Sequence, residues 1–125
     1  MPPVGEPVPD NMSELSARVR SYLQALKSDQ LPVTYQALAA AMELSPPNTI
    51  RQISTALETL MAEDAAAAQP FIATLVVSKG RSGIPAIGFY DCARKLGRYQ
   101  GSDNGADARA FHKSEYERAI EERLK

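Results

Sequence analysis

The sequence has one cysteine, Cys92, one histidine, His112, and no tryptophan among its 125 residues. A single cysteine excludes an intramolecular disulfide and a cysteine-based metal site within one chain. A single histidine likewise excludes a histidine-rich metal site. We therefore expect no metal and no cofactor.

Long apolar runs and an excess of one charge are also missing. No segment approaches the length of a membrane span, and the first residues lack the basic and apolar segments of a signal peptide, so we expect a cytoplasmic location and no membrane contact. The chain carries 14 basic and 15 acidic residues, for a net charge of -1. This balance argues against a protein that coats nucleic acid, but it permits a local basic patch.

The first two-thirds of the chain predict three helices after a proline-rich leader, residues 1–11, that we expect to be disordered. Apolar residues at helical spacing place the first helix at residues 13–27. Thr34 is the expected N-cap of the second helix, and Leu44 to Pro47 form a turn. The third helix starts at Asn48 or Thr49 and ends at Pro70. Its predicted core face is Ile50, Ile53, Leu57, Leu60 and Met61.

After Pro70 the pattern changes to that of β-strands. Phe71–Ser78 and Ile84–Tyr90 are apolar and β-branched segments around a glycine-containing turn, so they predict a β-hairpin. Asp91 is expected to cap a short helix with Gly97 near its end. Residues 100–107 are expected to be a flexible loop, and 108–125 a charged helix. Phe111, Tyr116, Ile120 and Leu124 give that helix only a thin apolar stripe, which predicts weak docking or a partner.

This order of elements resembles the winged-helix branch of the helix-turn-helix proteins. The segment VTYQALAAAMELSPPNTIRQISTALETL is similar to the core of that fold, and VVSKGRSGIPAIGFY is similar to its wing. The resemblance implies a mainly helical α+β fold: a winged-helix domain over residues 12–99, made of three helices and a hairpin wing, followed by the loop and the C-terminal helix.

The resemblance also implies a surface that binds DNA. In this fold the third helix enters the major groove, where arginine can pair with guanine and asparagine or glutamine with adenine. The wing would contact phosphates. The candidate residues are Asn48, Thr49, Arg51, Gln52 and Thr55 on the helix and Lys79 and Arg81 on the wing, with Arg94, Lys95 and Arg98 as an extension. The alternative is that these residues are ordinary surface residues.

From these residues we expect sequence-specific binding of double-stranded DNA, in a small transcriptional regulator of bacterial type. With so few cations, a monomer would bind DNA weakly at physiological salt. We therefore expect a regulator to form a homodimer on a two-fold site. The alternative function is a winged-helix adaptor that binds only proteins, with the C-terminal helix as a partner surface. Exposure of Phe89 or Tyr99 would favour the adaptor.

Two further groups of residues raise other functions. His112 and Glu115 share a helix face, as a general base and its orienting carboxylate would, but no nucleophile pairs with them, and we expect no enzyme. Cys92, near Arg94 and Lys95 at a predicted helix start, has the surroundings of a redox-sensing thiol. A lone cysteine is more often a small buried apolar residue.

Overall fold

The structure is a computed structural model that describes residues 11–123, with side chains from residue 14 onward. The first ten residues of the predicted leader, and Leu124 of the predicted C-terminal stripe, lie outside the described residues. The helices are α1 (Asn11–Ala25), α2 (Tyr35–Ala41), α3 (Thr49–Ala66), α4 (Ile87–Lys95) and α5 (Gly105–Arg123). Short 3-10 helices are η1 (Ser28–Gln30), η2 (Ile72–Leu75) and η3 (Lys79–Arg81).

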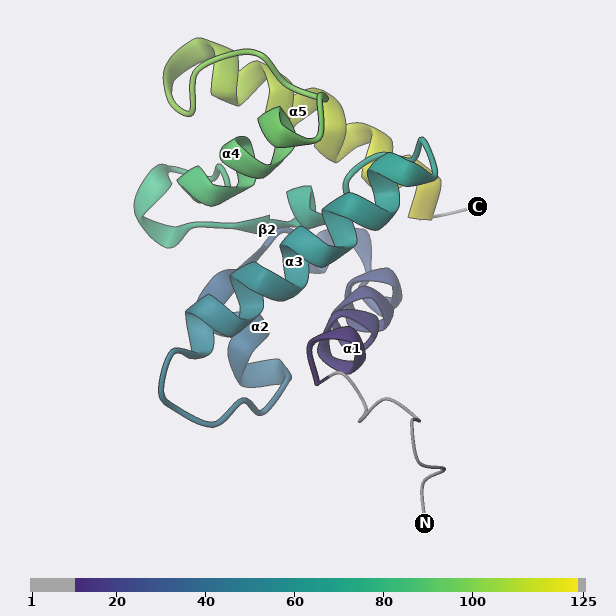
Figure 1. Cartoon of the computed structure of the whole chain (residues 1–125), viewed down its shortest axis with the longest axis vertical. Helices are drawn as coiled ribbons and strands as arrows, with labels where there is room; N and C mark the ends of the chain where they lie inside the picture. Colours follow the sequence, from purple (N-terminus) through teal and green to yellow (C-terminus); the bar gives the residue numbers. More distant parts are fainter. Residues whose placement is uncertain (1–10, 124–125) are drawn as a thin grey trace.

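The first three helices are the ones that the apolar periodicity predicted, and the mainly helical α+β class is confirmed. Thr34 caps α2 as expected, because its Oγ1 accepts a hydrogen bond from the Ala37 amide at 3.1 Å. α3 crosses the middle of the molecule, with α1 and α2 on one side and α4 and α5 on the other (Figure 1). Its apolar face, with Ile53 and Leu60, is buried in the core.

The predicted β-hairpin is wrong. Of its first strand only β2 (Val76–Val77) forms, and it pairs in parallel with β1 (Val33–Thr34), in the register Val33 to Val76 and Thr34 to Val77. The residues of the second predicted strand lead into α4 instead, which begins after Pro85. Phe89, Tyr90 and Ala93 are buried with the three- and four-residue spacing of a helix.

The segment 71–77 is buried at every position, because helices cover it on several sides. A fully apolar run carries no alternation, so its sequence does not distinguish a strand from a 3-10 turn. The short helix near Cys92 is α4, which starts at Ile87 rather than after Asp91. Its expected end near Gly97 is confirmed, with Gly97 at a φ of 77°.

The C-terminal helix α5 begins at Gly105, three residues before the predicted start, and it does not dock weakly. Ala108, His112, Glu115 and Ala119 are all buried on its inner face. The Tyr90 hydroxyl also donates to the Ala108 carbonyl at 2.9 Å. The apolar stripe was thin because polar side chains, His112 and Glu115, take part of the buried face.

Candidate nucleic-acid interface

The first two turns of α3 form an exposed surface without acidic residues. Arg51 and Thr55 are exposed there, and the first carboxylate along the helix is that of Glu58. Asn48 precedes the helix in the left-handed conformation, at a φ of 64°, and its side chain does not cap the helix. The amide groups of the first turn, at the positive end of the helix dipole, are therefore not capped by the Asn48 side chain.

Arg51 differs from every other arginine that the structure describes. The other arginines each donate at least one hydrogen bond to a main-chain carbonyl or a carboxylate of the protein. Among the described residues, Arg51 makes no hydrogen bond or ion pair, and it is exposed. Its guanidinium keeps all its donors for a molecule outside the protein.

Gln52 lies beside Arg51 but is committed to the protein. Its Nε2 donates to the carbonyls of Ser45, at 3.3 Å, and Pro47, at 3.2 Å. Both amide hydrogens are thereby used to fasten the turn onto the first turn of α3. From the other side, the Arg18 guanidinium of α1 donates to the Met42 carbonyl at 2.9 Å. Gln52 was predicted to read a base, whereas these contacts make it a holder of the turn.

The two cations of the predicted wing have different surroundings. Lys79 is exposed in η3, in the loop that follows β2, and this loop lies on the same side of the molecule as the start of α3 (Figure 1). Arg81 points inward: it donates to the carbonyls of Pro85, at 2.9 Å, and Asp103, and lies 5.8 Å from the centre of the Tyr90 ring. The Arg81 guanidinium is thus engaged in contacts within the protein.

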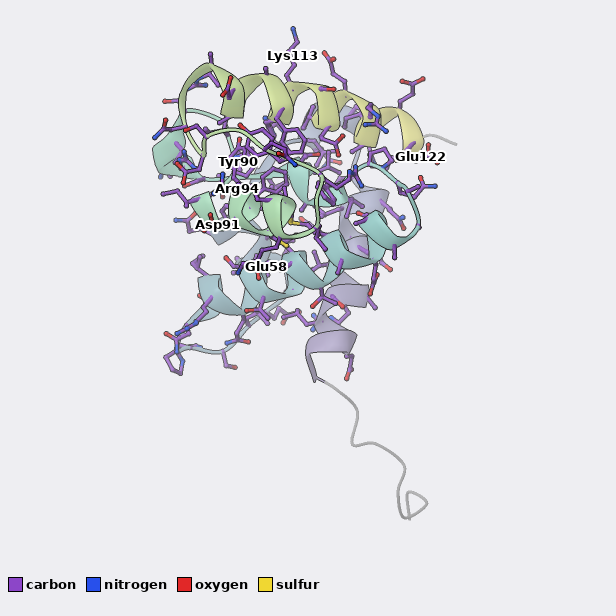
Figure 2. All side chains as sticks on the ribbon, turned by 45° about the horizontal axis from the view of Figure 1, so that its top comes forward. Glu58, Tyr90, Asp91, Arg94, Lys113 and Glu122 are labelled. Atoms are coloured by element: carbon purple, nitrogen blue, oxygen red, sulfur yellow. The ribbon has the colours of Figure 1, made fainter. Side chains whose placement is uncertain are left out.

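The three cations after the predicted wing do not form one patch. Arg94 donates to the Gly101 carbonyl at 2.9 Å and pairs with Asp91; Figure 2 shows these two side chains of α4. Arg98 donates to the Glu115 carboxylate at 2.9 Å and lies 4.3 Å from the centre of the Phe71 ring. Lys95 alone is exposed. The candidates that remain are therefore Asn48, Thr49, Arg51, Thr55 and Lys79, and separately Lys95 on α4.

The aromatic residues that follow the predicted wing belong to the core. Phe89 and Tyr99 are buried, and Tyr99 and Phe111 stack at 4.4 Å between ring centroids. Burial raises the pKa of Tyr90 to about 12. The exposed aromatic surface that would favour a protein interface is therefore not formed by these residues.

His112 and Glu115 bind different groups of the protein. The His112 Nε2 lies 2.9 Å from the Thr74 carbonyl, so it carries the proton and donates. Burial lowers the pKa of His112. Glu115 accepts from the Phe71 amide at 3.2 Å and from Arg98 and Arg118. Both side chains fasten α5 to η2 and its neighbours.

Cys92 lies within α4 rather than at its start. Burial raises the pKa of its half-buried thiol, and the negative charge of Glu58 raises it further. A redox-sensing thiol needs a lowered pKa, so the surroundings act in the opposite direction. Within residues 14–123, no group of three or more histidine, cysteine or acidic side chains could hold a metal ion.

An apolar groove borders the candidate surface. It has a volume of about 280 Å³ and is lined by Gln36, Ala39, Ala40, Leu44, Thr49 and Ile50. Ile50 was predicted to be in the core, but the residue is 38% exposed and lines this groove. On the helical wheel Ile50 falls within the apolar arc of α3, between Leu57 and the buried Met61, so the sequence pattern gives no signal of its exposure.

None of the helices described over residues 11–123 is both long enough and apolar enough to cross a membrane. No family model, no curated protein and no solved structure matches this chain.

Proposed function

We propose that α2, the turn and α3 work as a helix-turn-helix that binds double-stranded DNA, in a regulator of transcription. The single observation that carries the proposal is the free guanidinium of Arg51 on the acid-free start of α3. Arginine pairs bidentately with O6 and N7 of guanine, and a helix start fits the major groove. Asn48 and Thr55 lie close to Arg51 on the helical wheel, and Thr49 lies in the same turn. Lys79 supplies a phosphate contact from the loop after β2, on the same side of the molecule (Figure 1).

The surface also limits where DNA could lie. Glu58 follows Thr55 by one turn on the same face of α3, and Asp91 is exposed on α4 beside it (Figure 2). These carboxylates repel phosphates, so the contact is confined to the first two turns of α3. With few free cations, binding is weak at physiological salt and strengthens as the salt concentration falls. A homodimer on a two-fold site would double the contacts.

The test compares two variants that lose the same charge. Wild type, Arg51→Ala and Lys113→Ala are titrated against a labelled mixed-sequence duplex by fluorescence anisotropy, at low and near-physiological salt. Lys113 is exposed on the outer face of α5, far from the start of α3 (Figure 2). We expect Arg51→Ala to cost about 1–3 kcal/mol of binding free energy, roughly 5- to 150-fold in Kd. Lys113→Ala should bind like wild type.

An Arg51→Lys variant separates charge from geometry. Lysine keeps the positive charge but not the planar fork, so it should restore binding to mixed-sequence DNA only in part. Equal losses in Arg51→Ala and Lys113→Ala, or no binding by wild type at low salt, would contradict the proposal.

The alternative function, a protein-binding adaptor, has one observation in its favour: the apolar groove between α2 and α3. The near-neutral charge of the chain is compatible with it. Wild type that binds no DNA at low salt would direct the search to a protein partner for this groove and for α5.

A further inference from the structure

Ile50 is one of two large apolar side chains that are exposed among the residues that the structure describes. It is 38% exposed, and Ile87, at the start of α4, is 51% exposed. Ile50 lies in the first turn of α3 and directly precedes Arg51. An apolar side chain therefore lies in the same turn of α3 as Arg51, about a quarter turn around the helix from it.

The surroundings of the two isoleucines differ in charge. The groove beside Ile50 is lined by alanine, leucine, threonine and glutamine side chains, without a carboxylate. Near Ile87, a carboxylate oxygen of Glu58 lies 3.7 Å from the position that a Cβ would take at Gly88, and Asp91 follows one turn later. A polyanion can therefore approach Ile50 but is repelled at Ile87.

We propose that Ile50 contacts a pyrimidine 5-methyl group in the major groove, next to the base pair that Arg51 contacts. This inference rests on the proposed function. The thymine methyl is the apolar group that unmodified DNA presents in that groove, and apolar side chains read it. A 5-methylcytosine presents the same group at the same ring position. Ile50 is thus a specificity-determining residue for 5-methylated pyrimidines.

The observations favour DNA over a protein as the molecule that covers Ile50. The unpartnered Arg51 and the uncapped helix start give this edge of the groove a positive character. Stable protein interfaces bury at least about 1,000 Å² in total, with an apolar centre. Two isolated exposed isoleucines within residues 14–123 do not supply such a centre.

The experiment changes only methyl groups on the DNA. Three duplexes share one sequence that wild type binds: the unmodified duplex, one with deoxyuridine in place of thymidine, and one with 5-methylcytosine in place of cytosine. Burial of one methyl group is worth about fourfold in affinity. We expect wild type to lose about fourfold on the deoxyuridine duplex, or to gain about fourfold on the methylcytosine duplex, and the duplex that responds identifies the source of the methyl group.

Ile50→Ala should bind all three duplexes with the same Kd, while Ile87→Ala, the matched control, keeps the wild-type ratios. Circular dichroism checks that the helix content of both variants matches that of wild type. Equal affinity of wild type for all three duplexes overturns the inference and leaves DNA binding standing. An Ile50→Ala variant that keeps the wild-type ratios overturns it as well. Wild type that binds none of the duplexes overturns the proposed function together with the inference.

Discussion

Arginine side chains in this protein mostly hold main-chain carbonyl groups. Arg18 donates to the carbonyl of Met42 at the end of α2, and Arg98 donates to the carbonyl of Gln69 after α3. Helix ends leave carbonyls without an intrahelical partner, and a guanidinium offers several donors to them. A count of cations in the sequence therefore overstates the charge that is available to DNA, because only the structure separates Arg51 from Arg81, Arg94 and Arg98.

Glu115 gives a test at the scale of one residue. It is 3% exposed, and its carboxylate accepts from the Phe71 amide and pairs with Arg98 and Arg118. Glu115→Ala leaves the amide and one guanidinium nitrogen of Arg98 without their acceptor, so we expect a loss of about 3 kcal/mol in the free energy of unfolding. Urea denaturation measures it. Glu117→Ala, an exposed change on the same helix, should stay within about 0.5 kcal/mol. Equal midpoints for the two variants would contradict the role of Glu115.

At the scale of the element, three helices end in the same way. After α2, α3 and α4, a residue takes the left-handed conformation and two amides donate back to carbonyls of the last turn. This is the Schellman arrangement, in which glycine is the favoured residue. Gly97 occupies the position after α4, but Glu43, at a φ of 55°, and Ala68, at 56°, occupy it after α2 and α3. Their side chains strain the backbone, because Cβ crowds the following carbonyl.

The strain predicts opposite effects of one substitution at two exposed sites. Ala68→Gly should raise the free energy of unfolding by about 1 kcal/mol, because glycine takes the left-handed conformation without a clash. Ala62→Gly, within α3, should lower it by a similar amount, because glycine is a poor residue in a helix interior. Urea midpoints of the two variants measure the difference. A midpoint of Ala68→Gly below that of wild type would show that the end of α3 carries no strain.

The same scale explains why the predicted wing failed. The three helices could be predicted because each buries one face, so that the apolar period remains visible in Leu38, Ile53 and Leu60. Phe71–Val77 is buried at every position and has no period to read. Because an apolar run precedes them, Phe89 and Tyr90 were predicted to lie in a strand and Ala93 in the helix after it. The helical spacing of these three residues was therefore not recognised.

At the scale of the whole molecule, α5 ties the end of the described chain to its beginning. Arg123 donates to the carbonyls of Leu23, Gln24 and Leu26 at the end of α1. These contacts join residues about 100 positions apart in the sequence. Together with the buried inner face of α5, they make the C-terminal helix part of the core rather than an appendage.

Arg123→Ala tests this connection. It removes the side-chain partner of three carbonyl groups, and a hydrogen bond from a charged group contributes about 1.5–3 kcal/mol, so we expect a loss of about 2 kcal/mol in the free energy of unfolding. Thermal unfolding followed by circular dichroism and by tyrosine fluorescence should show one coincident transition at a lower Tm. Lys113→Ala should leave the Tm unchanged. Two separate transitions in wild type would contradict a shared core.

The sequence by itself determined the mainly helical class, the three N-terminal helices, the Thr34 cap and the exposure of Asn48, Arg51 and Thr55. These properties depend on residue spacing within one helix, which the sequence contains. Only the tertiary structure decided the fate of Ile84–Tyr90, the exposure of Ile50 and the engagement of Gln52 and most arginines. Those outcomes depend on carbonyls and apolar surfaces brought together from distant parts of the chain, which no local pattern records.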